Sequence, residues 1–235
     1  MALEAFVERP LRVANNLAKG GCEGDYVDAC LLVSGLVSAI ASFVWPGTQG
    51  DRKRFIEACV RFSEKTCDAT KISVPLLRIS LVEEKRFDEV RALEGARPQF
   101  FGPGYGARVL QGHEVDSDET DLRTEFPKMD LPMLRQHAYP TVFYEQVRCK
   151  LVHEGELDGK AARYPMTTLD GARISYVNRT VAVMGGGEVS EPQRDRRIFF
   201  HMTWLTDLVR TMARNADAEL AKGPISKPAR WWVEA

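Results

Sequence analysis

The feature that most constrains this chain is a run of 17 residues without a charged side chain, Ala29–Trp45 (ACLLVSGLVSAIASFVW). A run of this length lies near the lower limit for a helix that spans a bilayer. Asp25 and Asp28 stand at its start, where they would cap a helix, and Pro46 directly follows its end. Serines and a glycine interrupt the apolar residues, which is typical of a helix that neighbouring helices bury. We therefore predict a central core helix and no contact with a membrane.

Helical spacing of apolar residues recurs over most of the chain, with glycine or proline between the segments. Three helices in the first third, joined by short links, would pack antiparallel. Pro140 is expected to divide a short lead-in from a later helix, which Gly155 would end. The expected helices cover residues 3–18, 26–45, 52–64, about 75–92, 141–153 and 196–222. The sequence thus predicts a mainly α-helical bundle that forms a single domain, residues 1–235.

Two segments depart from this helical pattern. Residues 95–130 hold several glycines and prolines and then the acidic run EVDSDETD, which predicts a surface loop. Residues 172–183 (ARISYVNRTVAV) alternate apolar and polar side chains like a strand, with Asn178 and Arg179 at a turn. We therefore expect a β-hairpin, within an insertion over 160–195, ahead of the last long helix.

The charges of the chain nearly balance, with 32 Lys and Arg against 33 Asp and Glu. No global field would pull such a chain onto nucleic acid, so any polyanion must be met by a local cluster. The five cysteines are odd in number and lack the spacing of zinc ligands, which is typical of reduced thiols. Glu4, Glu8 and Arg9 make the first residues unlike a secretion signal. We expect a cytoplasmic protein.

One segment, RCKLVHEG, holds two residues that suit chemistry on a phosphodiester, Arg148 and His153. Arginine holds phosphate oxygens in a fork of donors, and histidine exchanges a proton near neutral pH. Both residues close a predicted helix. Five residues at about 100° each separate their side chains by about 140° around an ideal helix. They would converge if the last turn unwinds, or if two copies of the helix meet across a dimer axis.

A purely structural role for these two residues stays open. A protonated His153 would be favoured by the helix dipole at this end, and Arg148 would pair with Glu145 or Glu154. In that case the chain would be a small-molecule-binding or regulatory helical protein, in which the spacing is coincidental.

The stretch VRCKLVHEG resembles the signature of the HEPN superfamily, in which an arginine, a short spacer and a histidine end a late helix of a small bundle. The resemblance implies an all-α homodimer, and the active members are endoribonucleases that need no metal and no cofactor. It assigns Arg148 to stabilising charge on the phosphate. It assigns His153 to activating the ribose 2′-OH or protonating the leaving oxygen, which gives a 2′,3′-cyclic phosphate. Where the family commonly has a polar residue after the arginine, this chain has Cys149.

Other candidates for chemistry are weaker. Cys149 is a possible nucleophile because its basic neighbours would lower the pKa of its thiol, but no orienting Asn or Asp is evident. His113 and His137 have no carboxylate or Cys at the spacing of metal ligands. His201 lies near an apolar face and is interpreted as a structural residue, with a second catalytic role as the alternative.

Two functions from different classes follow from the sequence. The first is a HEPN-like endoribonuclease of toxin or antiviral-defence type, which cleaves RNA at a site shared between two copies of the chain. The second is a non-catalytic RNA-binding or assembly module in a larger complex. A protein inhibitor or a larger defence complex is a possible partner of the chain. The balanced charge and Cys149 favour the second.

Overall fold

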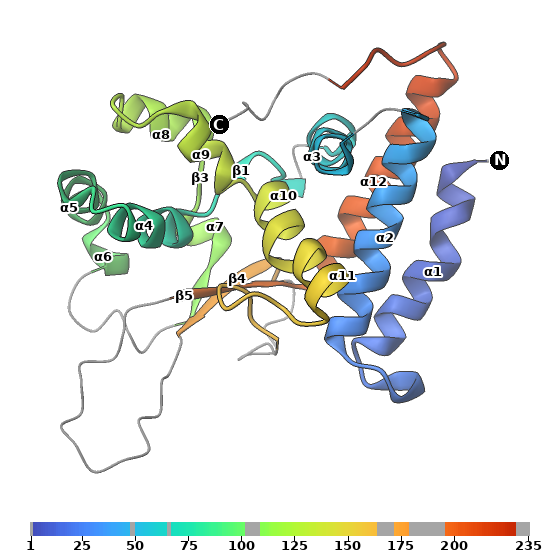
Figure 1. Cartoon of the computed structure of the whole chain (residues 1–235), viewed down its shortest axis with the longest axis horizontal. Helices are drawn as coiled ribbons and strands as arrows, with labels where there is room; N and C mark the ends of the chain where they lie inside the picture. The colour runs from blue at the N-terminus through green and yellow to red at the C-terminus, as the bar shows by residue number, and fades with distance from the viewer. Residues whose placement is uncertain are drawn as a thin grey trace.

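The computed structural model describes residues 2–47, 50–64, 67–101, 109–163, 172–178 and 196–228. Within these ranges the chain is mainly helical and has two small antiparallel sheets (Figure 1). The predicted mainly-α class is therefore confirmed.

Long helices form one side of the molecule. Helices α1 (Leu3–Leu17), α2 (Tyr26–Val44) and α12 (Met202–Leu220) lie side by side and contact one another, and α3 (Asp51–Phe62) packs against α2 and α12 (Figure 1). Asp25 begins α2 by accepting from the backbone N–H of Val27, while the Asp28 carboxylate accepts from the N–H of Asp25. The three helices predicted in the first third, and the capping role of the two aspartates, are confirmed.

Helix α2 is long and apolar enough to cross a membrane when judged by length and composition alone. In this fold half of its most apolar stretch is buried inside the protein. Ala29, Val33 and Val37 on its inner face are fully enclosed, and the helix contacts α1, α3 and α12. The charge-free run is thus the central helix of the bundle.

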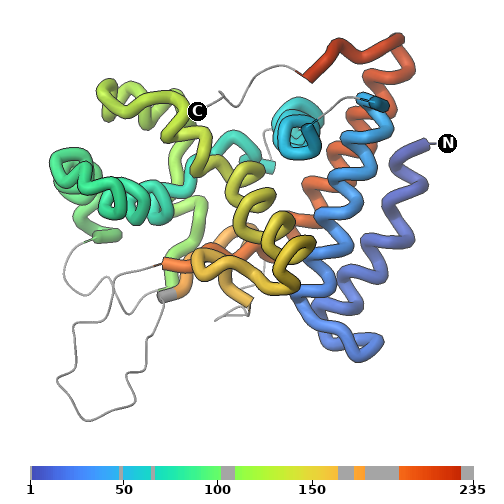
Figure 2. The backbone as a smooth tube through the Cα atoms, viewed as in Figure 1, coloured from blue at the N-terminus to red at the C-terminus, as the bar shows by residue number. Residues whose placement is uncertain are grey.

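A single helical rod carries the Arg148 segment. It consists of α10 (Tyr139–Val142), a π-helical stretch η4 (Phe143–Cys149) and α11 (Lys150–Glu154), and Figure 2 shows it in yellow between two groups of helices. Pro140 lies in the first turn of this rod, where its missing N–H costs nothing. A separate short helix, α9 (Leu131–Gln136), ends just before it, so the predicted division near Pro140 is confirmed. Gly155 ends the rod with a left-handed φ of 73°, as predicted.

The chain between α3 and this rod folds into short elements, and two predictions about it are wrong. The helix expected over 75–92 is broken at Lys85, which has a left-handed φ of 60°. The loop expected over 95–130 buries Leu110, Val115 and Leu122, because its polar residues cover the outer faces of short helices. The elements are β1 (Lys71–Ile72), α4 (Val74–Glu83), α5 (Phe87–Ala96), α6 (Pro98–Phe101), β2 (Leu110–Gln111), α7 (Gly112–Val115), β3 (Ser117–Asp118), α8 (Glu119–Glu125) and α9 (Leu131–Gln136). β1 pairs with β3.

A three-stranded sheet has the order β2-β4-β5 and lies beneath the rod. β4 (Ile174–Asn178) confirms the first strand of the predicted hairpin, but its long antiparallel partner is β5 (Arg196–Phe200). The helix predicted from residue 196 therefore begins only at Met202, since a short apolar run fits a strand as well as a helix. The expected second strand at 181–183 and the glycine-rich loop after it lie outside the described residues.

Candidate functional site

Arg148 points into the junction between the rod, α2 and α3. Its Nη2 lies 2.7 Å from Oδ2 of Asp51 at the start of α3, and its Nε donates to Oγ of Ser38 on α2 at 2.9 Å. The guanidinium carbon lies 5.1 Å from the centre of the Tyr144 ring, and the side chain is 17% exposed. Neither polar contact uses Nη1, so the guanidinium keeps donors for a further acceptor.

Asp51 organises this junction. Gly50, with a φ of 90°, turns the chain so that Asp51 falls in the first turn of α3, where the helix dipole favours a carboxylate. Its Oδ2 also accepts from the Tyr144 hydroxyl at 3.2 Å. Burial raises the pKa of Tyr144, and the neighbouring Cys149 and Asp51 raise it further, so the phenol stays protonated and donates. One carboxylate oxygen therefore holds both the guanidinium and the phenol.

The predicted pairing of Arg148 with a glutamate of its own helix is wrong. Glu145 pairs with Arg52 at 2.5 Å, and Glu154 pairs with Lys150 at 2.7 Å. Arg148 instead faces the neighbouring helices, because its side of the rod packs against α2 and α3.

His153 lies in the last turn of α11 and is exposed. In the described part of the chain its ring takes part in no hydrogen bond and no ion pair. The ring is therefore open to a ligand from solvent.

The structure does not join Arg148 to His153 within one chain. The π-helical stretch ends at Cys149, and α11 stays helical through Glu154, so the last turn does not unwind before His153. Arg148 faces α2 and α3, whereas His153 faces solvent. Any site that uses both residues needs a ligand or a second copy to bridge them.

The remaining histidines include two that are neutral hydrogen-bonding residues. His137 is buried between the Met133 carbonyl at 2.8 Å and Ser80 Oγ at 2.7 Å, and burial lowers its pKa to about 4. His201 lies 2.9 Å from Ser175 Oγ, and burial likewise lowers its pKa to about 4. His113, in contrast, is exposed on α7.

Sequence reasoning missed a buried cluster around Asp116. Its Oδ2 accepts from the hydroxyls of Tyr139 and Tyr176, the latter at 2.6 Å, and its Oδ1 accepts from the N–H of Val74 at 3.0 Å. Burial raises the pKa of Asp116 to about 7, although the two tyrosine hydrogen bonds act in the opposite direction. A Cβ at Gly112 would lie 2.6 Å from the Tyr139 hydroxyl, so only glycine fits there. Within the run EVDSDETD nothing local distinguishes this carboxylate from its more exposed neighbours.

Among the residues that the structure describes, no three His, Cys, Asp or Glu side chains gather closely enough to hold a metal ion. Comparison of the chain with protein-family models, with curated proteins and with solved structures gave no match. The resemblance to the HEPN superfamily therefore rests on the RCKLVH segment and the helical order around it.

Proposed function

We propose that this chain is a HEPN-like, metal-independent endoribonuclease. One observation carries the proposal: a single helix ends in an exposed His153 and, five residues earlier, holds the Arg148 guanidinium between Asp51 and Ser38. The ion pair keeps the guanidinium oriented, and Nη1 remains for a phosphate oxygen. An imidazole on the surface can reach a ribose that the protein does not enclose.

The chemistry follows from these two groups. The ribose 2′-oxygen attacks the neighbouring phosphorus while the bond from phosphorus to the 5′-oxygen breaks, which leaves a 2′,3′-cyclic phosphate and a 5′-hydroxyl. His153 accepts the proton of the 2′-OH or gives one to the departing 5′-oxygen. Arg148 stabilises the negative charge that builds up on the phosphate oxygens.

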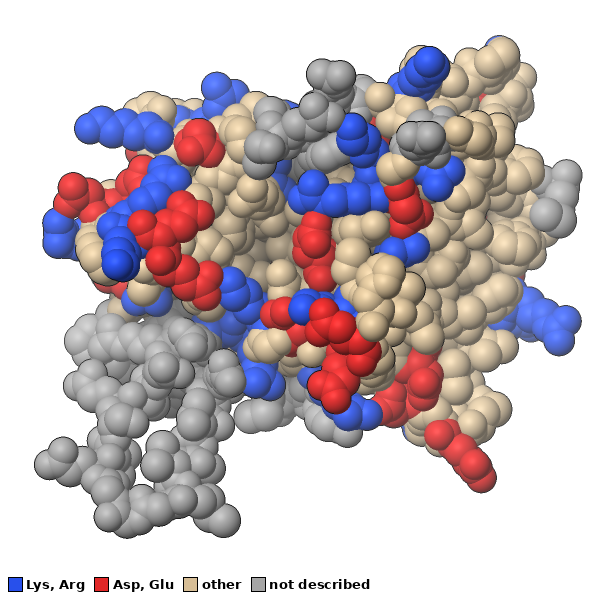
Figure 3. Space-filling model, in the orientation of Figure 1, with Lys and Arg blue, Asp and Glu red and all other residues tan. Residues whose placement is uncertain are grey.

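We also propose that a second copy of the chain completes the site, because the two residues lie on different sides of one helix. Helix α2 exposes Leu31 and Phe43, at 44% and 48%, and α11 exposes Val152 at 50%. Figure 3 shows few charged side chains on the surface over α2. Exposed apolar side chains on both helices suit a contact with a second copy. Leu31→Asp and Phe43→Asp should shift a dimer to monomers in sedimentation velocity, and a wild-type chain that is monomeric at micromolar concentration would exclude the shared site.

The activity is tested by incubating purified protein with single-stranded RNA in excess chelator. Wild type should cleave, whereas His153→Ala and Arg148→Ala should not. His113→Ala is the matched control, because His113 is exposed and distant in sequence from the site. Arg148→Lys, with its thermal unfolding measured in parallel, separates loss of chemistry from loss of the Asp51 contact. Cleavage by His153→Ala at the wild-type rate would end the proposal.

A non-catalytic RNA-binding or assembly module is the second candidate, and the pairing of Arg148 with Asp51 favours it. A carboxylate 2.7 Å from the guanidinium repels a phosphate that approaches the same group, and the chain has a net charge of only −1. Such a module would bind RNA without cutting it. The two candidates differ in their effect on a bacterial host that expresses the chain. Toxicity of the wild type that is relieved by His153→Ala would favour a cytoplasmic toxin or defence nuclease over this alternative.

A further inference from the structure

A pocket of about 300 Å³ opens beside the end of α11. Its walls come from three places: the first turn of α2 at Val27, the loop from Gly155 to Gly159, and β5 at Arg197. Gly155 lies two residues after His153, so one wall of the pocket begins at the end of the helix that carries this histidine.

The walls of this pocket are fixed by backbone contacts. The Ile198 N–H donates to the Lys160 carbonyl at 2.8 Å, and the Ala162 N–H donates to the Ile198 carbonyl at 2.7 Å, which ties the loop to β5. The Phe199 ring stacks on Tyr26 at 4.5 Å and brings β5 onto the start of α2. Side chains alternate along a strand, so Arg197 lies on the same face as Phe199. The shape of the pocket is therefore set by contacts between the loop, β5 and α2.

Arg197 lines this pocket, and no partner for it lies among the described residues. Its Nε is enclosed and makes no hydrogen bond, and no ion pair or hydrogen bond among the described residues includes its guanidinium. Arg163, the other arginine of the pocket, is held by Asp25 at 2.8 Å. A partly desolvated charge without a counter-ion costs free energy that an anionic ligand would recover.

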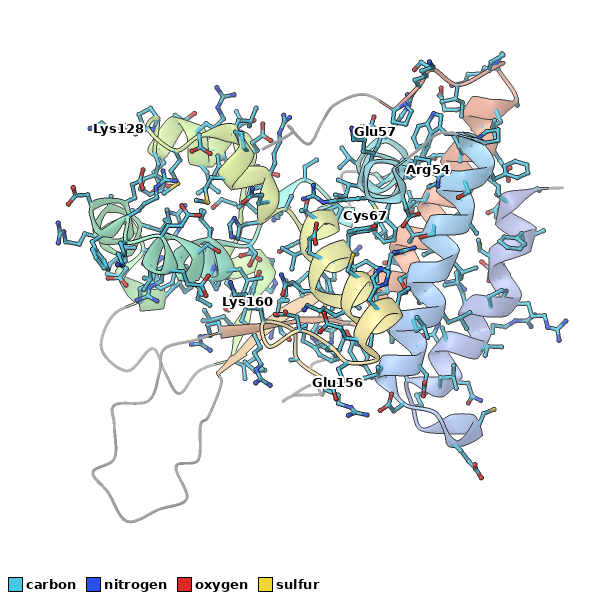
Figure 4. The ribbon with its side chains drawn as sticks, viewed as in Figure 1. Arg54, Glu57, Cys67, Lys128, Glu156 and Lys160 are labelled. Carbon is cyan, nitrogen blue, oxygen red and sulfur yellow. The ribbon has the colours of Figure 1, made fainter. Side chains whose placement is uncertain are left out.

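Two carboxylates restrict the kind of anion that fits. Asp158 accepts from the Lys160 N–H at 2.9 Å and lies 3.9 Å from Lys150 Nζ, so its charge is partly offset. Glu156 lies on the exposed loop after α11 (Figure 4). These carboxylates would accept hydrogen bonds from a ligand that also carries donors. A nucleotide unit has this combination, because its phosphate is anionic while its ribose and base carry O–H and N–H groups.

We propose that this pocket binds the phosphate of a ribonucleotide through Arg197. The proposal rests on the proposed function, and it assigns the pocket to the nucleotide next to the one that is cleaved. The phosphate could belong to an RNA chain or to a free mononucleotide. Both are anions that an arginine fork recognises in the same way.

The test measures binding in a His153→Ala background, in which RNA should stay intact. The probes are a fluorescein-labelled single-stranded RNA, followed by anisotropy, and adenosine 5′-monophosphate, followed by calorimetry. Arg197→Gln should weaken binding about tenfold or more, as expected for loss of a charge-assisted hydrogen bond. It should also reduce the salt dependence of RNA binding by about one phosphate contact. Arg9→Gln is the matched control, because Arg9 is exposed on α1.

The outcomes separate the two sources of phosphate. A loss for RNA alone assigns the pocket to a chain phosphate, and a loss for both probes assigns it to a mononucleotide unit. Arg197→Lys, which keeps the charge but not the fork, should lose less than Arg197→Gln and serves if the latter unfolds. Three results would overturn the proposal. Arg197→Gln could bind as tightly as its parent, Arg9→Gln could lose as much affinity as Arg197→Gln, or the parent could bind neither probe. If the wild-type chain cleaves no RNA but the mononucleotide still binds in an Arg197-dependent way, the proposed nuclease activity is refuted while the proposed phosphate site at Arg197 is supported.

Discussion

Replacing Asp116 by Asn should change how the stability of this protein depends on pH. Asp116 is enclosed by Tyr139, Tyr176 and the N–H of Val74, and burial raises its pKa from 3.8 to about 7. One pKa unit corresponds to about 1.4 kcal/mol, so the shift is equivalent to about 4 kcal/mol in the free energy of unfolding. Asn has nearly the same shape and never ionises, so the variant lacks this contribution.

The direction follows from the protons that each state binds. Between pH 3.8 and about 7 the folded chain keeps the Asp116 proton, whereas the unfolded chain has released it. The stabilising contribution of this group is therefore complete below pH 3.8 and is lost as the pH rises through about 7. His137 and His201 act in the opposite direction, because their folded pKa of about 4 lies below the ordinary 6.5. Their contribution is present above pH 6.5 and is lost as the pH falls toward 4.

The measurement is urea unfolding of wild type and Asp116→Asn at intervals from pH 4 to pH 8. Both histidines are present in both proteins, so their effect cancels in the difference. The stability of the variant relative to wild type should rise by up to about 4 kcal/mol across this range. Two profiles that stay parallel from pH 4 to pH 8 would refute the assignment of a protonated, buried Asp116.

Three further predictions concern stability and use the same unfolding assay. Gly112→Ala should lower the free energy of unfolding by about 1–3 kcal/mol, because its Cβ would lie 2.6 Å from the Tyr139 hydroxyl; an unchanged value would mean that the cluster is looser than described. Asp25→Ala should cost about 1 kcal/mol through loss of the α2 cap, and a neutral effect would exclude that capping role. Arg148→Gln should cost about 1–3 kcal/mol through loss of its contacts in the helix junction, whereas His153→Ala should leave the melting temperature unchanged; the reverse order would contradict the placement of the two residues.

Local signals in the sequence account for the elements that could be predicted. The cap at Asp25, the apolar run after it and the left-handed glycine at 155 each act within a few residues, so α2 and the end of the rod could be located in advance. The elements that were missed depend on distant partners. Residues 196–200 form a strand because β4 lies beside them, although their spacing also fits the helix that follows. The π-helical stretch has no local signature in this sequence.

The same distinction applies to the candidate site. Sequence alone placed Arg148 and His153 at the end of one helix, because helical spacing and Gly155 define that end. It did not reveal Asp51 as the partner of Arg148, since that contact forms only when α3 packs against the rod. It also did not reveal the pocket at Arg197, which has no partner among the described residues and whose environment is made by a loop and a helix from other parts of the chain.

The most direct test of the central claim is cleavage of an RNA oligonucleotide at a mapped site, in excess chelator, beside an oligonucleotide with a single 2′-deoxyribose at that position. Attack by the 2′-oxygen predicts that wild type cuts the first substrate, leaves a 2′,3′-cyclic phosphate on it and does not cut the second, and that His153→Ala cuts neither. Cleavage of both substrates by the wild type would contradict attack by the 2′-oxygen. Cleavage of the all-ribose substrate by His153→Ala at the wild-type rate would contradict the role of His153, and a wild-type chain that cuts no RNA would contradict the proposed activity.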